Sequence, residues 1–428
     1  MKFTCAGDFL AQRRFPGEYE GFAPLRDYIM KGDFRFVNLE TTLNEPGECY
    51  GSQFCGGSYL RAVPETVLDV KKYGFNILSA ANNHTLDYSY GGLLATIDAL
   101  KKYDMPHAGI GRNLSEAAAP AYLDTLNGRA ALISVTASFH ETAMAGEQNR
   151  LVKGRPGVNG LRNDTYYTVS KKEMEMIREL ARVTQINGYT DVVRAEGYRP
   201  PLPEGAFDFG TIRFFEGEET RKVQKANKKD MKRVEKAIFD AKLQADCIIV
   251  SLHAHDMLGA NKELPAEYVE EFARACIDFG AHAVIGHGPH LLRPLEIYKG
   301  KPIFYSLGNF LLNNENIPYA PEEMYDKEGL EGTATMHELF EKRSGGFKRG
   351  LYTAVKNYET IVPYFEIEEG ELTKLEFMPV ELGFGLPRSR YGMPRYDKNP
   401  AFIERFADLC ALYGTKFDEK DGLYRVKL

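Results

Sequence analysis

Long apolar runs are missing from this sequence. No hydrophobic stretch approaches the roughly 18 residues that a membrane-spanning helix requires. The first residues, MKFTCAGDFL, contain neither a basic segment nor a cleavage site of small residues. We therefore expect a cytoplasmic protein without a membrane span.

A large excess of one charge is also missing. The 54 Lys and Arg residues stand against 60 Asp and Glu residues, which gives a net charge of -6. This balance produces no general field that would attract nucleic acid, so we expect no nucleic-acid partner. A polyanionic substrate would need a local basic patch.

Cysteine is scarce, and its six residues are scattered. Cys5, Cys247 and Cys276 lie in apolar stretches, where they indicate small core residues. Only Cys49 and Cys55 lie close together, in a glycine-rich loop. A disulfide is conceivable there, but two free thiols are the favoured interpretation.

The 428 residues contain strand-like runs that alternate with helical patterns. The strand-like runs are KFTCA, FRFVNLE, NILSAA, AALISV, CIIVSLH, HAVIG and PIFYSLG. The helical patterns cover Pro64–Tyr73, Gly92–Tyr103, Glu218–Gln244 and Leu264–Phe279. Such alternation predicts an α/β fold with largely parallel strands.

Other segments interrupt this pattern. Residues 138–217 predict an insertion with one helix near 171–183, and residues 1–382 otherwise form the main domain. The sequence IVPYFEIEEGELTKLEFMPVEL predicts a hairpin that forms an antiparallel edge. Residues 383–428 predict a C-terminal extension with a helix at 400–413 that packs back on the body.

The segment Glu218–Gln244 is locally basic. Its apolar positions Val223, Met231, Val234 and Ile238 fall on one stripe of a helix. We interpret it as a surface helix with a solvated charged face. The alternative is a rim that binds anions.

Polar side chains follow six of the strand-like runs. They are Asp8, Asn38 and Glu40, Asn82 to His84, His253 to Asp256, His287 to His290, and Asn309. Ligands of α/β sheets bind beyond the carboxyl ends of strands, so these groups should meet. Oxygen and imidazole ligands without thiolate are typical of Mn, Fe or Zn in a hydrolytic site with one or two ions.

Five of these motifs occur in a recognisable order: AGDFL, VNLETTL, SAANNHTLDY, VSLHAHD and IGHGPHLLRPLEIYKGKPIFYSLGNFL. The order resembles the bacterial capsule-synthesis, or poly-γ-glutamate synthesis, protein family, which is similar to calcineurin-like metallophosphoesterases. The resemblance runs from Lys2 to about Leu312. It implies a metallophosphoesterase-like αββα sandwich with mixed sheets, an inserted segment and a C-terminal extension.

The resemblance also implies roles for individual residues. The implied metal ligands are Asp8, Glu40, Asn83, His253 and His290. Asp8, His84 and His290 are the implied catalytic residues, with His84 stabilising developing charge. Arg61 would anchor a phosphate or carboxylate, and Asn309 would order the site.

The sequence departs from the family pattern at three places. Leu10 stands where metallophosphoesterases usually have a metal-binding His. His255 either restores a ligand or fills the space of a usual Trp. Gly288 stands where many members have a His, and the neighbouring His287 is a further candidate ligand. One metal ion or two therefore both stay open.

Three functions follow from this pattern. The first is a metal-dependent hydrolase of a phosphoester or a glutamyl-type amide. The substrate we expect is a small molecule or a glutamyl peptide. The second is a metal-independent epimerase or isomerase of a peptide, in which Asp8 and His290 exchange a proton. The third is a non-catalytic component that binds polyglutamate during polymer synthesis.

Overall fold

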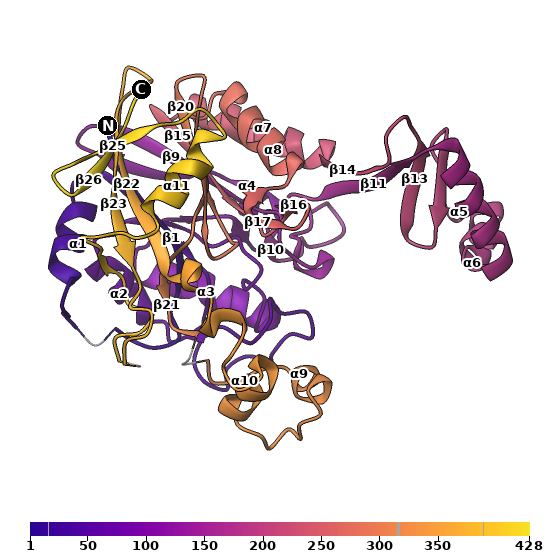
Figure 1. Cartoon of the computed structure of the whole chain (residues 1–428), viewed down its shortest axis with the longest axis horizontal. Helices are drawn as coiled ribbons and strands as arrows, with labels where there is room; N and C mark the ends of the chain where they lie inside the picture. Colours follow the sequence, from indigo (N-terminus) through magenta and orange to yellow (C-terminus); the bar gives the residue numbers. More distant parts are fainter. Residues whose placement is uncertain (16, 315–316, 388) are drawn as a thin grey trace. The chain divides into compact units, whose positions relative to one another are not determined.

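The computed structural model describes residues 1–15, 17–314, 317–387 and 389–428. Its contacts divide the chain into two compact units, residues 1–161 with 229–428, and residues 162–228 (Figure 1). The first unit contains two large sheets, and the second contains a small one.

The first large sheet has ten strands, with β1 in its interior. One group runs parallel: β1 (Lys2–Leu10), β2 (Phe34–Leu39), β5 (Ile77–Ser79), β6 (His107–Ala108) and β21 (Asn309–Leu312). The other group is antiparallel: β22 (Glu359–Glu368), β23 (Glu371–Glu381), β24 (Arg395–Tyr396), β25 (Phe417–Lys420) and β26 (Leu423–Val426). The sheet is therefore mixed.

The second large sheet has six strands and is also mixed. In spatial order they are β19 (Leu292–Tyr298), β20 (Lys301–Leu307), β18 (Ala283–His287), β15 (Cys247–His253), β9 (Gly128–Thr136) and β8 (Ala121–Thr125). The four central strands run parallel, and the two outer ones are antiparallel to their neighbours.

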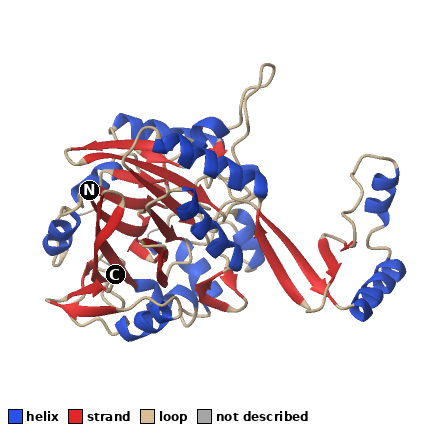
Figure 2. Ribbon diagram, turned by 90° about the horizontal axis from the view of Figure 1, so that it is seen from above, coloured by secondary structure: helices blue, strands red, loops and turns tan. Residues whose placement is uncertain are grey.

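Apolar side chains of the two sheets pack against each other. Phe3 and Phe36 of the first sheet share one buried cluster with Ile285 of the second. On the other face of the first sheet, Val37 packs with Leu25 of a covering helix. The covering helices there are α1 (Phe22–Ile29), α2 (Thr66–Lys72) and α3 (Ser89–Lys102), while α8 (Glu267–Phe279) contacts β18 and β20. In Figure 2, layers of helices lie on either side of the strands, which confirms the predicted α/β sandwich.

The predicted hairpin forms, but the prediction that it is a sheet edge is wrong. β22 and β23 turn at Glu369 and Gly370, both of which have positive φ. β22 pairs with β1, and β23 pairs with β26 from the C-terminal residues. The strands β25 and β26 thus continue the sheet beyond the hairpin, and α11 (Ile403–Ala411) contacts β19.

The predicted helix over 218–244 is also wrong in its first half. Residues 221–226 form β14 (Arg221–Ala226), which pairs with β11, and the helix α7 begins only at Lys228 and ends at Lys242. The helical stripe was misleading because the apolar Val223 is buried as a strand residue. Pairing with another strand overrode the local pattern.

The second unit is a four-stranded sheet with two helices. Its strands, in spatial order, are β12 (Ala206–Phe209), β13 (Ile212–Glu216), β11 (Asn163–Val169) and β14, and its helices are α5 (Lys171–Thr184) and α6 (Gly188–Ala195). Ser170 and Glu173 form a capping box that begins α5. This unit overlaps the insertion that we expected at 138–217, but it begins at 162 and ends at 228.

Short elements complete the first unit. They are β3 (Thr42–Leu43), β4 (Arg61–Ala62), β7 (Ile110–Gly111), α4 (Leu114–Ala118), β10 (Gly157–Val158), β16 (Met257–Leu258), β17 (Asn261–Pro265), α9 (Glu322–Lys327) and α10 (Met336–Ser344). Among the described residues, none of the helices combines the length and apolar character needed to cross a bilayer. Cys49 and Cys55 are free thiols, as favoured above.

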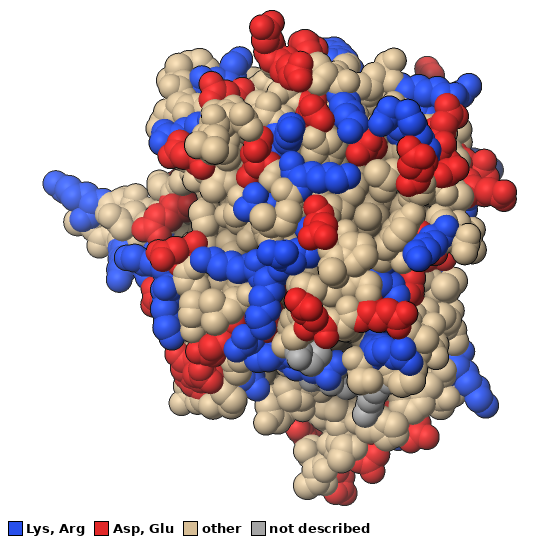
Figure 3. Space-filling view, turned by 90° about the vertical axis from the view of Figure 1, so that its left-hand side faces the viewer, with Lys and Arg blue, Asp and Glu red and all other residues tan. Residues whose placement is uncertain are grey.

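The charged surface is mixed rather than of one sign. On the face in Figure 3, Lys and Arg side chains are interspersed with Asp and Glu side chains. This distribution agrees with the modest net charge of -6. Recognition of an anion would therefore depend on particular arginine or lysine side chains.

Candidate metal centre

Asp8 lies inside β1, where the two sheets approach each other at one end. The preceding residue must be glycine, because a Cβ atom at Gly7 would lie 1.8 Å from the carbonyl oxygen of Gly308. The Asp8 carboxylate accepts hydrogen bonds from Nδ2 of Asn38 (2.7 Å) and from the backbone N–H of Gly288 (3.0 Å). Burial nevertheless raises the pKa of Asp8 to about 7.

Glu40 follows β2 and is fully buried. Within the described part of the chain, neither of its side-chain oxygens has a hydrogen-bond partner. Oε1 lies 3.7 Å from Nε2 of His253 and 3.9 Å from Nε2 of His290. Burial, together with the negative charge of Asp8, raises the pKa of Glu40 well above its usual range. A buried carboxylate without partners is costly unless a proton or a cation neutralises it.

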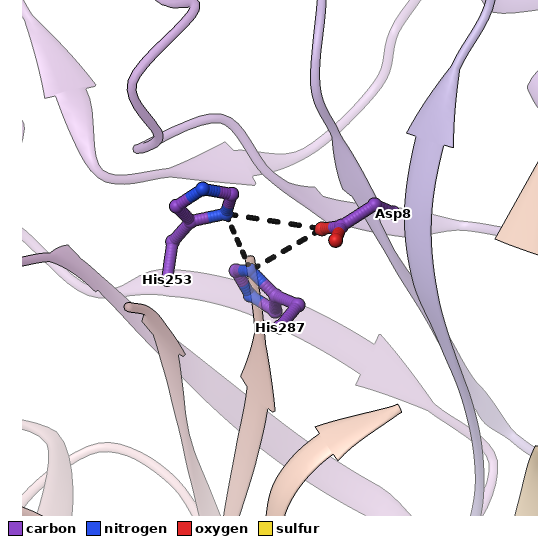
Figure 4. Close-up of side chains that lie close together, drawn as sticks. All are labelled: Asp8, His253 and His287. Atoms are coloured by element: carbon purple, nitrogen blue, oxygen red, sulfur yellow. Dashed lines mark hydrogen bonds and ion pairs between the residues drawn. The ribbon is translucent and has the colours of Figure 1, made fainter. Parts of the chain in front are cut away.

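The ends of β15 and β18 bring two buried imidazoles to the same place. Nδ1 of His253 lies 3.0 Å from Nδ1 of His287, and these atoms lie 3.8 and 3.6 Å from Oδ1 of Asp8 (Figure 4). Nε2 of His287 lies 2.6 Å from Oγ of Ser251. Burial lowers the pKa of His253 well below its usual value and that of His287 to about 3, so both rings are neutral near pH 7.

The other nitrogen of His253 faces a different set of ligands. Its Nε2 lies 2.8 Å from Oδ1 of Asn83 and 3.2 Å from Nε2 of His255. Ligand atoms of Glu40, His253 and His255 lie within 4.8 Å of one another. The carbonyl oxygen and the imidazoles point to a common position, as ligands of one ion would.

His290 is held by backbone and amide contacts. Its φ of 60° is uncommon for a residue with a side chain, and such conformations cluster at functional sites. Nδ1 lies 2.9 Å from Oδ1 of Asn309, whose Nδ2 donates to the carbonyl of Asn357 (2.9 Å). The amide orientation makes Nδ1 the protonated nitrogen, which leaves the lone pair of Nε2 facing Glu40. Burial lowers the pKa of His290 to about 4.

His84 lies beside these ligands and has a carboxylate partner of its own. Its Nδ1 lies 2.6 Å from Oδ2 of Asp87, a fully buried residue. Asp87 also accepts hydrogen bonds from the backbone N–H groups of Gly56 and Leu60. Asp87 was not predicted, although its spacing of three residues from His84 in NNHTLDY was a signal for this pairing.

The described residues thus form three overlapping ligand groups. They are Asp8 with His253 and His287, Glu40 with His253 and His255, and Asp8 with Glu40 and His290. Neutral imidazoles and crowded carboxyl groups can bind a divalent cation, because the cation offsets the buried negative charge and accepts the free lone pairs. The residues therefore fit a metal ion such as Mn, Fe or Zn.

Comparison with known proteins identifies the family of this chain. The profile described as "Bacterial capsule synthesis protein PGA_cap" matches residues 2–314. The chain belongs to this bacterial capsule synthesis family. Its matched part includes every residue of the three ligand groups.

Individual relatives of this capsule synthesis family member differ in how they are named. The chain is 31% identical to an uncharacterized protein, y4sH, of Sinorhizobium fredii, over 99% of this chain and 92% of that protein. It is 27% identical to the capsule biosynthesis protein CapA of Bacillus anthracis, over 73% of this chain and 60% of that one. A probable polyglutamine synthesis accessory protein of Mycobacterium tuberculosis is 25% identical, over 67% of this chain and 57% of that one.

In this family member the ligand cluster opens into a cavity of about 470 Å³. His84 and His290 line it, together with Arg343, Arg349 and Tyr352. These last three residues were not predicted, because nothing in their local sequence indicates a fold back onto the strand ends. Arg61, which we expected to anchor substrate, is absent from the described lining and donates instead to the carbonyl of Asn44 (3.3 Å).

Proposed function

We propose that this protein is a metal-dependent hydrolase whose ion is held by Asp8, Glu40, Asn83, His253 and His290, with His255 as a further ligand. The observation that carries the proposal is the buried Glu40 carboxyl group, which has no hydrogen-bond partner among the described residues and faces two imidazole nitrogens. When bound, a divalent ion supplies a Lewis acid and lowers the pKa of a water molecule. The overlapping ligand groups accommodate one or two ions.

His287 then acts by orienting His253. If Nε2 of His253 is a ligand, Nδ1 carries the proton and donates it to Nδ1 of His287 at 3.0 Å. Nε2 of His287 in turn donates to Oγ of Ser251 at 2.6 Å. This chain of hydrogen bonds fixes the tautomer and the direction of His253, as partners of metal-binding histidines commonly do.

His84 is the group that can transfer a proton to the substrate. Its Nδ1 is engaged by Asp87, so its Nε2 is the nitrogen left for the cavity that His84 lines. A histidine oriented in this way can stabilise the developing charge and protonate the leaving group of a phosphoester or a glutamyl-type amide. The names of the relatives, which refer to capsule and polyglutamine synthesis, favour a glutamyl substrate.

A metal-independent epimerase has less support from the geometry. Asp8 is fully buried, and its two oxygens are engaged by Asn38 and Gly288. Its Oδ2 lies 3.9 Å from Nδ1 of His290, so the two groups adjoin each other instead of facing across a substrate. The word "accessory" in the mycobacterial relative's name favours the third function, a polyglutamate-binding component.

Metal analysis separates these functions. We expect protein purified without chelator to contain at least one transition metal ion per chain, and Glu40→Gln and His253→Gln to lose it. His140→Gln is the matched control, because His140 is an exposed imidazole that stacks on Phe54. Binding of polyglutamate without metal and without hydrolysis would support the accessory role and contradict the proposal.

A further inference from the structure

The cavity beside the ligand cluster has a wall from a part of the chain that the family profile does not reach. The match ends at residue 314, whereas α10 and the loop after it supply Phe340, Arg343, Arg349 and Tyr352. His84 and His290 line the same cavity. A molecule bound with its reacting group at these histidines would therefore extend to this wall.

Two guanidinium groups of this wall lack a carboxylate partner among the described residues. Nε of Arg349 donates to the carbonyl of Arg343 at 3.1 Å, and Nη1 of Arg343 lies 3.6 Å from the sulfur of Met324. Elsewhere in the chain, Arg233 is paired with Asp230 and Arg405 with Glu359. The positive charges of the wall are thus available to a ligand.

We infer that Arg343 and Arg349 form an anion-binding subsite that selects substrates carrying a carboxylate or phosphate group away from the scissile bond. A guanidinium group binds such an anion with two parallel N–H donors, which gives both energy and direction. Leu10, Leu60 and Tyr352 line the same cavity and offer apolar contacts to a methylene chain. A γ-glutamyl chain combines both features, with methylene groups and one carboxylate per residue.

The position of the reacting group in this inference rests on the proposed hydrolase function, whereas the anion-binding subsite does not. The net charge of -6 gives the protein no general attraction for anions. Binding should therefore depend on these two side chains and weaken with added salt.

Calorimetric titration of the full-length protein with tri-γ-glutamate and, separately, with tripolyphosphate tests the inference. We expect the wild type to bind at least one of them, and the double variant Arg343→Gln/Arg349→Gln to bind it at least tenfold more weakly. The matched control is Lys348→Gln, which removes an exposed positive charge from the same loop but not from the cavity lining. The preferred probe identifies the anion as carboxylate or phosphate.

The outcomes separate this inference from the proposed function. Equal binding by the wild type and the double variant, or no binding of either probe by the wild type, overturns the subsite. Equal weakening in Lys348→Gln also overturns it, because general charge would then explain the effect. Metal content, measured on the same samples, tests the hydrolase proposal independently. If metal-free protein binds the probe and the binding depends on the two arginines, the subsite is supported and the hydrolase proposal is contradicted.

Discussion

Glu40 and His253 face each other in the buried end of the sandwich, with Oε1 of the carboxyl group 3.7 Å from Nε2 of the ring. This separation exceeds that of a hydrogen bond, yet both residues are fully removed from solvent. Two ligand atoms that approach without bonding to each other leave space for a third atom between them. The proposed metal ion would lie between these two atoms, and the imidazole is neutral because burial lowers its pKa.

Replacing Glu40 with Gln should separate metal binding from folding. The amide keeps the size of the side chain but removes the negative charge. We therefore expect metal affinity to fall by at least tenfold. Without metal, the variant should unfold at a temperature no lower than that of the wild type. Metal titration and thermal unfolding with and without chelator measure both effects. A large loss of stability in the metal-free variant would show that Glu40 is needed for packing instead.

Removing the support of His253 should weaken metal binding without removing a ligand. If His287 orients His253 as proposed, His287→Gln should lower metal affinity by roughly 10- to 100-fold, the range found for partners of metal-binding histidines. Ser251→Ala should have a smaller effect in the same direction. If His287→Gln instead abolishes binding as completely as His253→Gln does, then His287 is itself a ligand.

The pair of His84 and Asp87 should affect turnover more than metal content. We expect His84→Gln to lower kcat by roughly 10²- to 10⁴-fold, as loss of a proton-transfer group does, with the metal retained. Asp87→Asn should lower kcat and also destabilise the loop at 56–60, because Asp87 accepts two backbone hydrogen bonds there. Unchanged turnover in His84→Gln, measured with any substrate the wild type hydrolyses, would remove His84 from the reaction.

A histidine far from the site should make stability depend on pH. Burial, with the nearby charge of Lys301, lowers the pKa of His282 to about 4, and its Nδ1 accepts the N–H of Ile248. The unfolded chain takes up a proton near pH 6.5, while the folded protein does so only near 4. The contribution of neutral His282 to stability is therefore present above about pH 6.5 and is lost as the pH falls toward 4.

The test for this effect compares two chains. Urea unfolding at pH 7 and pH 4.5 should show a larger loss of stability for the wild type than for His282→Gln, which keeps an acceptor but cannot be protonated. An equal loss in both chains would mean that other groups determine the acid sensitivity.

The strands of the sandwich could be predicted because each is a short apolar run followed by polar residues. Asp8, Glu40 and His253 were placed together on that basis, since the carboxyl ends of parallel strands meet at one edge. Relationships across distant segments could not be predicted. The pairing of β23 with β26, the strand that contains Val223, and the return of Arg343 and Arg349 to the cavity all depend on tertiary contacts that local pattern does not encode.

Within the site, too, the roles of individual residues could not be predicted from local sequence. His287 was only an additional candidate from the sequence, and its contact with Ser251 is what indicates an orienting role. Arg61 has the chemistry of an anion anchor, but its guanidinium group contacts the carbonyl of Asn44. Residue type suggested which side chains could take part, and only the three-dimensional placement shows which of them lie together.

Anomalous diffraction from crystals of protein prepared with Mn or Zn tests the central claim most directly. We predict a peak at the metal absorption edge within about 2.0 to 2.3 Å of a Glu40 oxygen and of Nε2 of His253. Stoichiometric metal bound elsewhere, or well-ordered electron density at Glu40 with no anomalous signal at saturating metal, would contradict the account.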